Sequence, residues 1–178
     1  MGKKDLGLIH IYCGEGKGKT TCSVGLTVRA SAYGHKVLFM QFLKPGTSSE
    51  LKALRTLPGV TVVNTTPTKK FTFMMTDEEK AEVRERNAKE FLEVVEMAKK
   101  EDVNMLVMDE TLGAIEAGVL DEDIIVDFLQ NKPEKLEVVM TGRYPSERMV
   151  ELADYVSRLD KVKHPYDAGI PARAGIED

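Results

Sequence analysis

The stretch that decides the fold is Leu8-Ile9-His10-Ile11-Tyr12-Cys13-Gly14-Glu15-Gly16-Lys17-Gly18-Lys19-Thr20-Thr21. Residues 8–13 are rich in β-branched and aromatic side chains and end at glycines, which predicts a short strand. Residues 20–33 predict a helix, and Gly34 is well placed as its C-terminal stop. A strand, a glycine-rich loop and a helix in this order are typical of a phosphate-binding loop.

The loop carries the groups that a triphosphate requires. Its three glycines allow backbone N–H groups to point at phosphate oxygens, and the start of the helix adds a partial positive charge. Lys17 and Lys19 add cations, and the Thr20 hydroxyl is expected to help hold Mg²⁺. In the common motif Gly-x-x-x-x-Gly-Lys-Ser/Thr, the first glycine falls at the position of Cys13, so the strict pattern is missed by one residue. The predicted nucleotide contacts from this loop are Gly14, Glu15, Gly16, Lys17, Gly18, Lys19, Thr20 and Thr21.

Strands and helices are expected to alternate along the rest of the chain. Residues 37–43 form a nearly continuous apolar run, which suits a strand covered on both faces. The further predicted strands are 60–63, 105–108, 136–140 and 155–159, and the predicted helices are 48–57, 77–100, 121–130 and 145–153. This order predicts an α/β, three-layer P-loop NTPase-type fold with a mainly parallel central sheet of about five or six strands flanked by helices.

A pair of carboxylates follows one of the predicted strands. Asp109-Glu110 comes directly after the apolar run Met105-Leu106-Val107-Met108. Acidic residues at the carboxyl end of a strand beside a phosphate loop commonly hold the metal or its water. We therefore predict that Thr20, Asp109 and Glu110 hold the metal ion, which is Mg²⁺ or, in its place, Mn²⁺.

Composition narrows the class of protein. The 178 residues suit a single domain, taken here as residues 1–178. The net charge of −4 and the lack of tryptophan argue against a nucleic-acid partner. The sequence contains no apolar run of transmembrane length, so no membrane partner is expected. Two cysteines are too few for a disulfide framework, and a reducing, cytoplasmic setting is the expectation.

Over most of its length the chain resembles the P-loop ATP:corrinoid adenosyltransferases, which finish the cobalt–carbon bond of coenzyme B12. The resemblance begins with the phosphate loop, where relatives also lack a glycine at the position of Cys13. It continues through segments that lie near the expected ends of strands and in the C-terminal tail. These segments are Arg29-Ala30 with Gly34, Gln41-Phe42-Leu43-Lys44, Val107-Met108-Asp109-Glu110, Thr141-Gly142-Arg143, Lys163-His164-Pro165-Tyr166-Asp167-Ala168-Gly169-Ile170 and Gly175-Ile176-Glu177.

This resemblance implies a reaction and a set of partners. A reduced Co(I) corrinoid attacks the C5′ carbon of ATP, and inorganic triphosphate leaves. Lys19 is then a catalytic residue that stabilises the leaving group, and Arg29 and Arg143 are nucleotide contacts. The resemblance also implies a homodimer and a flavodoxin-like reductant. Glu15 stands where relatives often have asparagine, which places a carboxylate beside the phosphates.

An irregular stretch, residues 64–76, holds two aromatic residues. Phe71-Thr72-Phe73 resembles a family segment, Phe-Thr-Trp, that packs near the lower face of the corrinoid. Aromatic side chains there exclude the lower axial ligand, and four-coordinate Co(II) is easier to reduce. By this resemblance Phe71 and Phe73 join Lys19 as catalytic residues, with Phe73 a smaller wedge than tryptophan.

Two alternatives use the same phosphate loop. A small-molecule kinase would release ADP rather than triphosphate. A nucleotide-switched ATPase module would act on a partner macromolecule and not on a corrinoid. Analysis of the product distinguishes all three.

Overall fold

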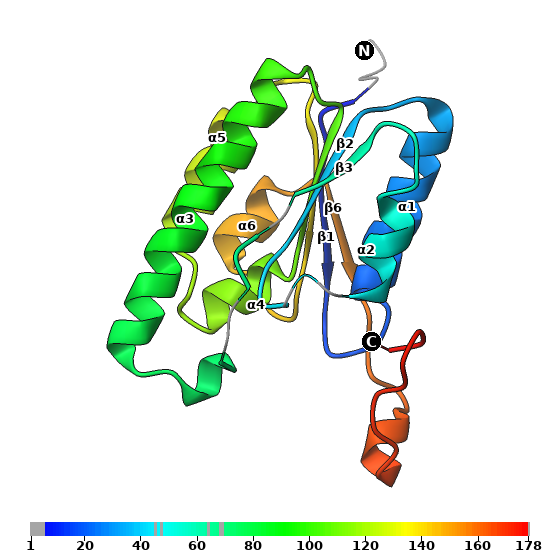
Figure 1. Ribbon diagram of the computed structural model, residues 1–178, viewed down its shortest axis with the longest axis vertical. Coiled ribbons are helices and arrows are strands. Elements are labelled where there is room, and N and C mark those ends of the chain that lie inside the picture. Colours follow the sequence, from blue (N-terminus) through cyan, green and yellow to red (C-terminus); the bar gives the residue numbers. More distant parts are fainter. Residues whose placement is uncertain (1–5, 45, 47, 64, 68–69, 178) are drawn as a thin grey trace.

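The computed structural model describes residues 6–44, 46, 48–63, 65–67 and 70–177. Six strands form one sheet, and helices cover both of its faces (Figure 1). The strands are β1 Ile9–Cys13, β2 Val37–Gln41, β3 Val60–Val62, β4 Met105–Asp109, β5 Glu137–Thr141 and β6 Tyr155–Arg158. The helices are α1 Lys19–Tyr33, α2 Ser49–Leu54, α3 Asp77–Lys100, α4 Thr111–Glu116, α5 Glu122–Asn131 and α6 Glu147–Leu152, with short 3₁₀ turns η1 Thr72–Met74 and η2 Pro165–Ala168.

The sheet has the strand order β3-β2-β4-β5-β1-β6, and every pairing between neighbours is parallel. The predicted three-layer α/β fold with a mainly parallel sheet of about five or six strands is confirmed. Because all strands run in one direction, their carboxyl ends meet at one edge of the sheet. The phosphate loop and the segments after β2, β4 and β5 therefore converge there.

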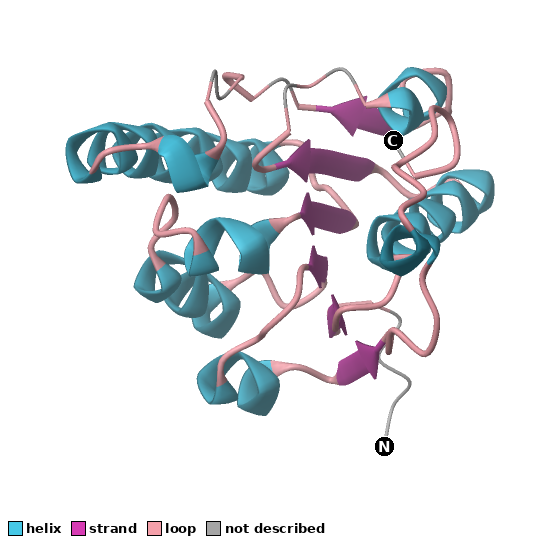
Figure 2. Ribbon diagram, turned by 90° about the horizontal axis from the view of Figure 1, so that it is seen from below, coloured by secondary structure: helices cyan, strands magenta, loops and turns pink. Residues whose placement is uncertain are grey.

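Side-chain alternation along the strands builds two hydrophobic layers. In β2, Leu38 and Met40 pack toward α3 and α5, whereas Val37 and Phe39 pack toward α1 and α2. The view along the sheet in Figure 2 shows helices on either side of it. Strands buried on both faces explain why residues 37–41 and 105–109 are buried throughout.

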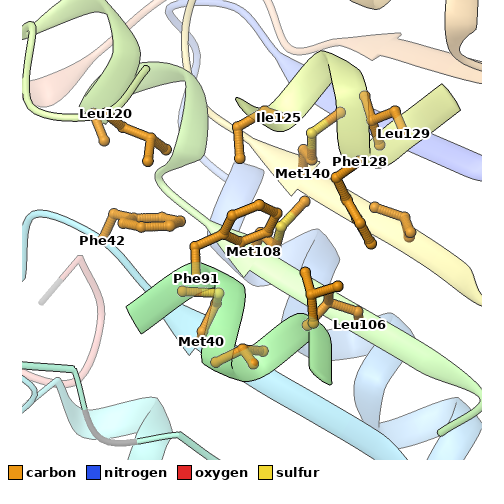
Figure 3. Packing of buried hydrophobic residues seen from close by; sticks show 14 of the residues in the cluster. Met40, Phe42, Phe91, Leu106, Met108, Leu120, Ile125, Phe128, Leu129 and Met140 are labelled. Carbon is orange, nitrogen blue, oxygen red and sulfur yellow. The ribbon is translucent and has the colours of Figure 1, made fainter. Parts of the chain in front are cut away.

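The larger layer centres on Phe91 of α3. Its side chain is fully buried, and its ring meets the Phe128 ring edge-on at a centroid distance of 5.3 Å. Figure 3 shows Phe91 close to Met40 and Met108 of the sheet. This packing fixes α3 against the strands whose ends build the site. The start of α3 is set by a capping box between Thr76 and Glu79, as the sequence pattern predicts.

Most of the predicted elements begin or end one to three residues away from the expected boundaries, and one helix was not predicted. The second strand ends at Gln41 and not at residue 43, because Leu43 takes a left-handed conformation with φ 62°. The last helix spans only Glu147–Leu152. Helix α4 was missed since it has six residues, includes a glycine and starts directly after the carboxylate pair.

Candidate active site at the carboxyl edge of the sheet

A cleft of about 690 Å³ opens at the carboxyl edge of the sheet. The phosphate loop and the first residues of α1 form one wall, and the start of α2 with Lys44 forms another. Glu110 also lines the cleft, as do residues of the C-terminal tail from His164 to Glu177. Such a cleft, with lysines in its lining and a helix N-terminus at its edge, suits a phosphate-bearing ligand.

Backbone contacts hold the loop at one end of the sheet. The N–H of Gly14 donates to the carbonyl of Arg143 at 2.9 Å, and the N–H of Gly16 donates to the carbonyl of Leu159 at 2.7 Å. The amides of Gly14 and Gly16 are therefore engaged with backbone carbonyls, and the prediction that both residues contact the nucleotide stays a prediction. Glycine is required at position 16 because an added Cβ would lie 2.7 Å from the Leu159 carbonyl oxygen and 2.8 Å from that of Asp160.

The amides available to an anion come from the first turn of α1. This helix begins after Gly18, which adopts φ 116° and has no side chain to cap it, and its first turn is Lys19, Thr20 and Thr21. The first N–H groups of a helix have no intrahelical acceptor. Together with the helix dipole, they make this end of the helix suitable for an anion, which is what the predicted phosphate loop requires.

The Lys19 side chain lies back on the loop. Its Nζ donates to the carbonyl of Gly16 at 2.8 Å. Burial lowers the pKa of Lys19, Glu110 opposes that shift, and Arg143 adds to it. Arg143, a predicted nucleotide contact, is thus close enough to Lys19 to interact with it electrostatically. The two cations repel one another, and an anion between them would relieve the repulsion.

Asp109 is fully buried, and hydrogen bonds satisfy both of its oxygens. Oδ1 accepts from the Thr141 hydroxyl at 2.7 Å, and Oδ2 accepts from the Gln41 amide at 2.9 Å and from the Thr20 hydroxyl at 3.2 Å. The structure therefore brings the predicted metal residues Thr20 and Asp109 into direct contact. Because Thr20 gives its proton to Asp109, its oxygen lone pairs are left for a cation.

Glu110 follows Asp109 in a left-handed conformation with φ 61°, and its N–H donates to the Thr141 hydroxyl at 2.9 Å. This turn directs the two neighbouring carboxylates differently, so Asp109 is fully buried while Glu110 lines the cleft. Burial raises the pKa of Glu110, the Asp109 charge raises it further, and Lys44, Lys19 and Arg143 counteract the rise. A carboxyl in this setting favours a cation placed beside it.

No group of three or more His, Cys, Asp or Glu side chains in the described ranges has the spacing of a metal site. The donors present fit a metal that a triphosphate brings with it. Thr20 supplies a hydroxyl and Glu110 a carboxylate at the same cleft, and Asp109 lies behind Thr20. Mg²⁺ typically takes only one or two protein ligands and completes its shell with phosphate oxygens and water.

The sequence patterns predicted no function for three polar residues of the site, Gln41, Lys44 and Glu50. The buried Gln41 amide donates to Asp109 at 2.9 Å and to Glu50 at 3.0 Å, and its oxygen accepts from the Ser48 hydroxyl at 3.1 Å. Lys44 pairs with Glu50 at 3.3 Å and with Asp109 at 3.7 Å. Gln41 and Lys44 belong to a segment singled out by resemblance, whereas no pattern indicated Glu50.

The C-terminal tail crosses the mouth of the loop. Glu177 Oε1 accepts from Lys17 Nζ at 3.2 Å, and the Arg173 guanidinium holds the same carboxylate with a 2.8 Å contact. The Arg173 hydrogen bonds, chiefly, lower the pKa of Glu177 to about 2. Glu15 accepts from the Tyr144 hydroxyl at 2.5 Å, so its carboxylate has a partner beside the loop.

Six predicted site residues do not line this cleft: Gly14, Asp109 and Arg143, which lie next to residues that do, and Arg29, Phe71 and Phe73. Arg29 is exposed on α1, about 15 Å along the helix axis from Lys19 at 1.5 Å per residue. Phe71 and Phe73 are 72% and 81% exposed, and their rings stack at a centroid distance of 5.4 Å. None of the six is among the described residues that line the cleft.

Comparison with known proteins identifies the family of this chain. The family model of ATP:corrinoid adenosyltransferase BtuR/CobO/CobP matches residues 5–177. The chain belongs to this family. The corrinoid adenosyltransferase of Pseudomonas aeruginosa is 30% identical, with the match covering 98% of this chain and 85% of that protein. The corrinoid adenosyltransferase of Escherichia coli K12 is 32% identical, with the match covering 96% of this chain and 85% of that protein.

A solved structure shows the same fold class at greater distance. The cytoplasmic domain of EssC matches with a TM-score of 0.51 and 16% identity, covering all of this chain and 40% of that one. At this identity the likeness concerns the fold alone. Among the described helices of the adenosyltransferase, none combines the length and the apolar character needed to span a bilayer.

Proposed function

We propose that this adenosyltransferase transfers the 5′-deoxyadenosyl group of ATP to the Co(I) centre of a corrinoid, with the triphosphate lying on residues 14–20. In this step a cobalt–carbon bond forms at C5′, and the C5′–oxygen bond breaks. The electron pair of that bond leaves with the triphosphate, and cobalt is formally oxidised from Co(I) to Co(III). The corrinoid supplies the nucleophile, so the protein's tasks are positioning and charge stabilisation.

One observation carries the proposal. The uncapped first turn of α1, the Lys19 ammonium and the Thr20–Asp109 pair meet at one end of a single cleft. Negative charge grows on the triphosphate as the C5′–oxygen bond breaks. We assign the stabilisation of that charge to Lys17 and Lys19, which line the cleft, and to Arg143 in the loop after β5, which interacts electrostatically with Lys19.

Mg²⁺, or Mn²⁺ in its place, would be held by the Thr20 hydroxyl, with Asp109 accepting the Thr20 proton and Glu110 facing the ion. When bound, the ion supplies positive charge to the triphosphate oxygens. Since Asp109 is satisfied by three donors, we assign it the role of orienting Thr20 and give the contact with the metal or its water to Glu110.

Phe71 and Phe73 are proposed to form an apolar wedge against the lower face of the corrinoid. Their stacked, exposed rings form a small aromatic surface on the loop before α3. A wedge that excludes the lower ligand eases reduction of Co(II) but is not needed once cobalt is Co(I). Phe71→Ala should therefore slow the reaction that starts from Co(II) more than the one that starts from chemically reduced Co(I).

Lys19→Ala is the matched comparison for Phe71→Ala. Negative charge develops on the triphosphate in the alkylation step, which is the same whether the reaction starts from Co(II) or from Co(I). This variant should lose turnover from both starting states. Equal losses from Co(II) and Co(I) in Phe71→Ala would contradict the wedge. Retained turnover in Lys19→Ala would contradict the placement of triphosphate on the loop.

Four further assignments rest on the sequence and the family resemblance. They are a single domain over residues 1–178, a homodimer, a flavodoxin-like reductant and a cytoplasmic location. Arg29 remains a proposed nucleotide contact on the same basis, and its exposed position on α1 leaves it free to act only after a rearrangement or from another subunit. Light scattering on the purified chain tests the dimer.

A further inference from the structure

Lys44 is a cleft residue to which neither the sequence patterns nor the proposed mechanism gives a task. It lines the same cleft as the phosphate-loop residues Lys17 and Lys19. Its side chain is 30% exposed, and its ammonium pairs with Glu50 at 3.3 Å and with Asp109 Oδ2 at 3.7 Å. Thr20 donates its hydroxyl to that same Asp109 oxygen, so Lys44 stands beside the proposed position of the metal and triphosphate.

Glu50 and Asp109, the two partners of Lys44, both have other hydrogen-bond donors. The Gln41 amide donates to Asp109 at 2.9 Å and to Glu50 at 3.0 Å, both shorter than the contacts that Lys44 makes. Thr141 and Thr20 give Asp109 two further donors. If Lys44 moves away, neither carboxylate is left buried without a hydrogen bond, which is the costly outcome for a buried charge.

The backbone at this point is shaped to present Lys44. Leu43 adopts φ 62°, a conformation that residues with a Cβ rarely take, and the N–H of Lys44 donates to the carbonyl of Phe42 at 2.8 Å. This tight turn ends β2 and directs the chain into the cleft wall. Backbone strain of this kind is concentrated at binding and catalytic sites.

We infer that Lys44 is a second triphosphate-binding lysine, which exchanges its contacts with Glu50 and Asp109 for the triphosphate oxygens when nucleotide binds. The inference rests on the proposed placement of triphosphate on residues 14–20. The exchange would add a cation from the segment after β2 to those of the loop, so that lysines from two parts of the cleft hold the leaving triphosphate. Glu50 then acts as the resting partner of Lys44, and Gln41 keeps the two carboxylates in place during the exchange.

The test uses inorganic triphosphate with Mg²⁺ as the ligand and isothermal titration calorimetry as the measurement, without any corrinoid. Lys44→Met should weaken binding by on the order of tenfold or more, as expected for loss of a charge-assisted hydrogen bond. Lys44→Arg, which keeps the charge, should lose less. Lys99→Met on α3, where the lysine pairs with Glu96 on the helix surface, is the matched control and should bind as the wild type does.

A double-mutant cycle isolates the exchange. Glu50→Gln should tighten triphosphate binding by a few-fold, because Lys44 then gives up a weaker contact, with a neutral amide, when it turns to the triphosphate. The same substitution in the Lys44→Met background should have no such effect. An equal gain in both backgrounds would mean a general change in charge and would overturn the inference. Circular dichroism of each variant confirms folding, and Lys44→Arg and Glu50→Gln keep the test valid if Lys44→Met does not fold.

Lys19→Ala separates this inference from the function on which it rests. Loss of triphosphate binding in Lys19→Ala, with unchanged binding in Lys44→Met, overturns the role of Lys44 alone. Unchanged binding in Lys19→Ala overturns the placement of triphosphate on the loop and the role of Lys44 together. Loss in both, with the Glu50 coupling present, supports both.

Discussion

Gly16→Ala should both destabilise the fold and disable the phosphate loop. The new methyl group would lie 2.7 Å from the Leu159 carbonyl oxygen and 2.8 Å from the Leu159 carbonyl carbon and the Asp160 carbonyl oxygen. All three are backbone atoms, so they cannot yield by changing a rotamer. Overpacking of this kind costs about 1–3 kcal/mol. The 2.7 Å hydrogen bond from Gly16 to Leu159 would be lost with it, at about 1 kcal/mol.

The expected loss in the free energy of unfolding is therefore about 2–4 kcal/mol. Gly25→Ala supplies the matched control, because Gly25 lies inside α1 and an added Cβ there meets nothing within 4 Å. Alanine is favoured over glycine in a helix interior, so this variant should gain about 0.5–1 kcal/mol. Urea unfolding followed by circular dichroism measures both. A Gly16→Ala protein as stable as the wild type, or a Gly25→Ala protein that is less stable, would refute the reasoning.

Three other expectations follow from single contacts. Phe91→Ala should cost about 3–5 kcal/mol of unfolding free energy, because the ring is fully buried at the centre of the larger layer, and urea unfolding measures it. Thr76→Ala removes the capping box of α3 and should lower the free energy of unfolding by about 1 kcal/mol. An unchanged free energy in the same urea assay would contradict the role of the cap. The Glu177 carboxyl should titrate with a pKa of about 2, so its contacts with Arg173 and Lys17 are present above pH 4.5 and are lost as pH falls toward 2. Carbon NMR of the carboxyl checks this, and a midpoint near 4.5 would contradict it.

Much of the architecture could be predicted because the strands are simple to recognise. The apolar runs that became β2 and β4 are buried on both faces, and the capping box fixed the start of α3. The contact between Thr20 and Asp109 was also within reach, since both follow parallel strands and such ends share one edge.

The rest of the site depends on packing that no local pattern reveals. Glu50 contacts the Gln41 amide, and Leu43 between them has a positive φ, a conformation for which a leucine gives no sequence signal. The amides of Gly14 and Gly16 are taken by carbonyls of residues 143 and 159, which lie far along the chain. Phe71 and Phe73 were assigned to the lower face of the corrinoid by resemblance alone, and in the structure they are exposed and outside the cleft.

The central claim is that the loop at residues 14–20 grips a triphosphate that leaves intact. The most direct test incubates the protein with MgATP and chemically reduced cobalamin under anoxia, with the visible spectrum and the phosphate products followed together. We predict that the spectrum of the alkylated corrinoid appears with one inorganic triphosphate released for each corrinoid converted. ADP or orthophosphate as the only phosphate product would contradict the account.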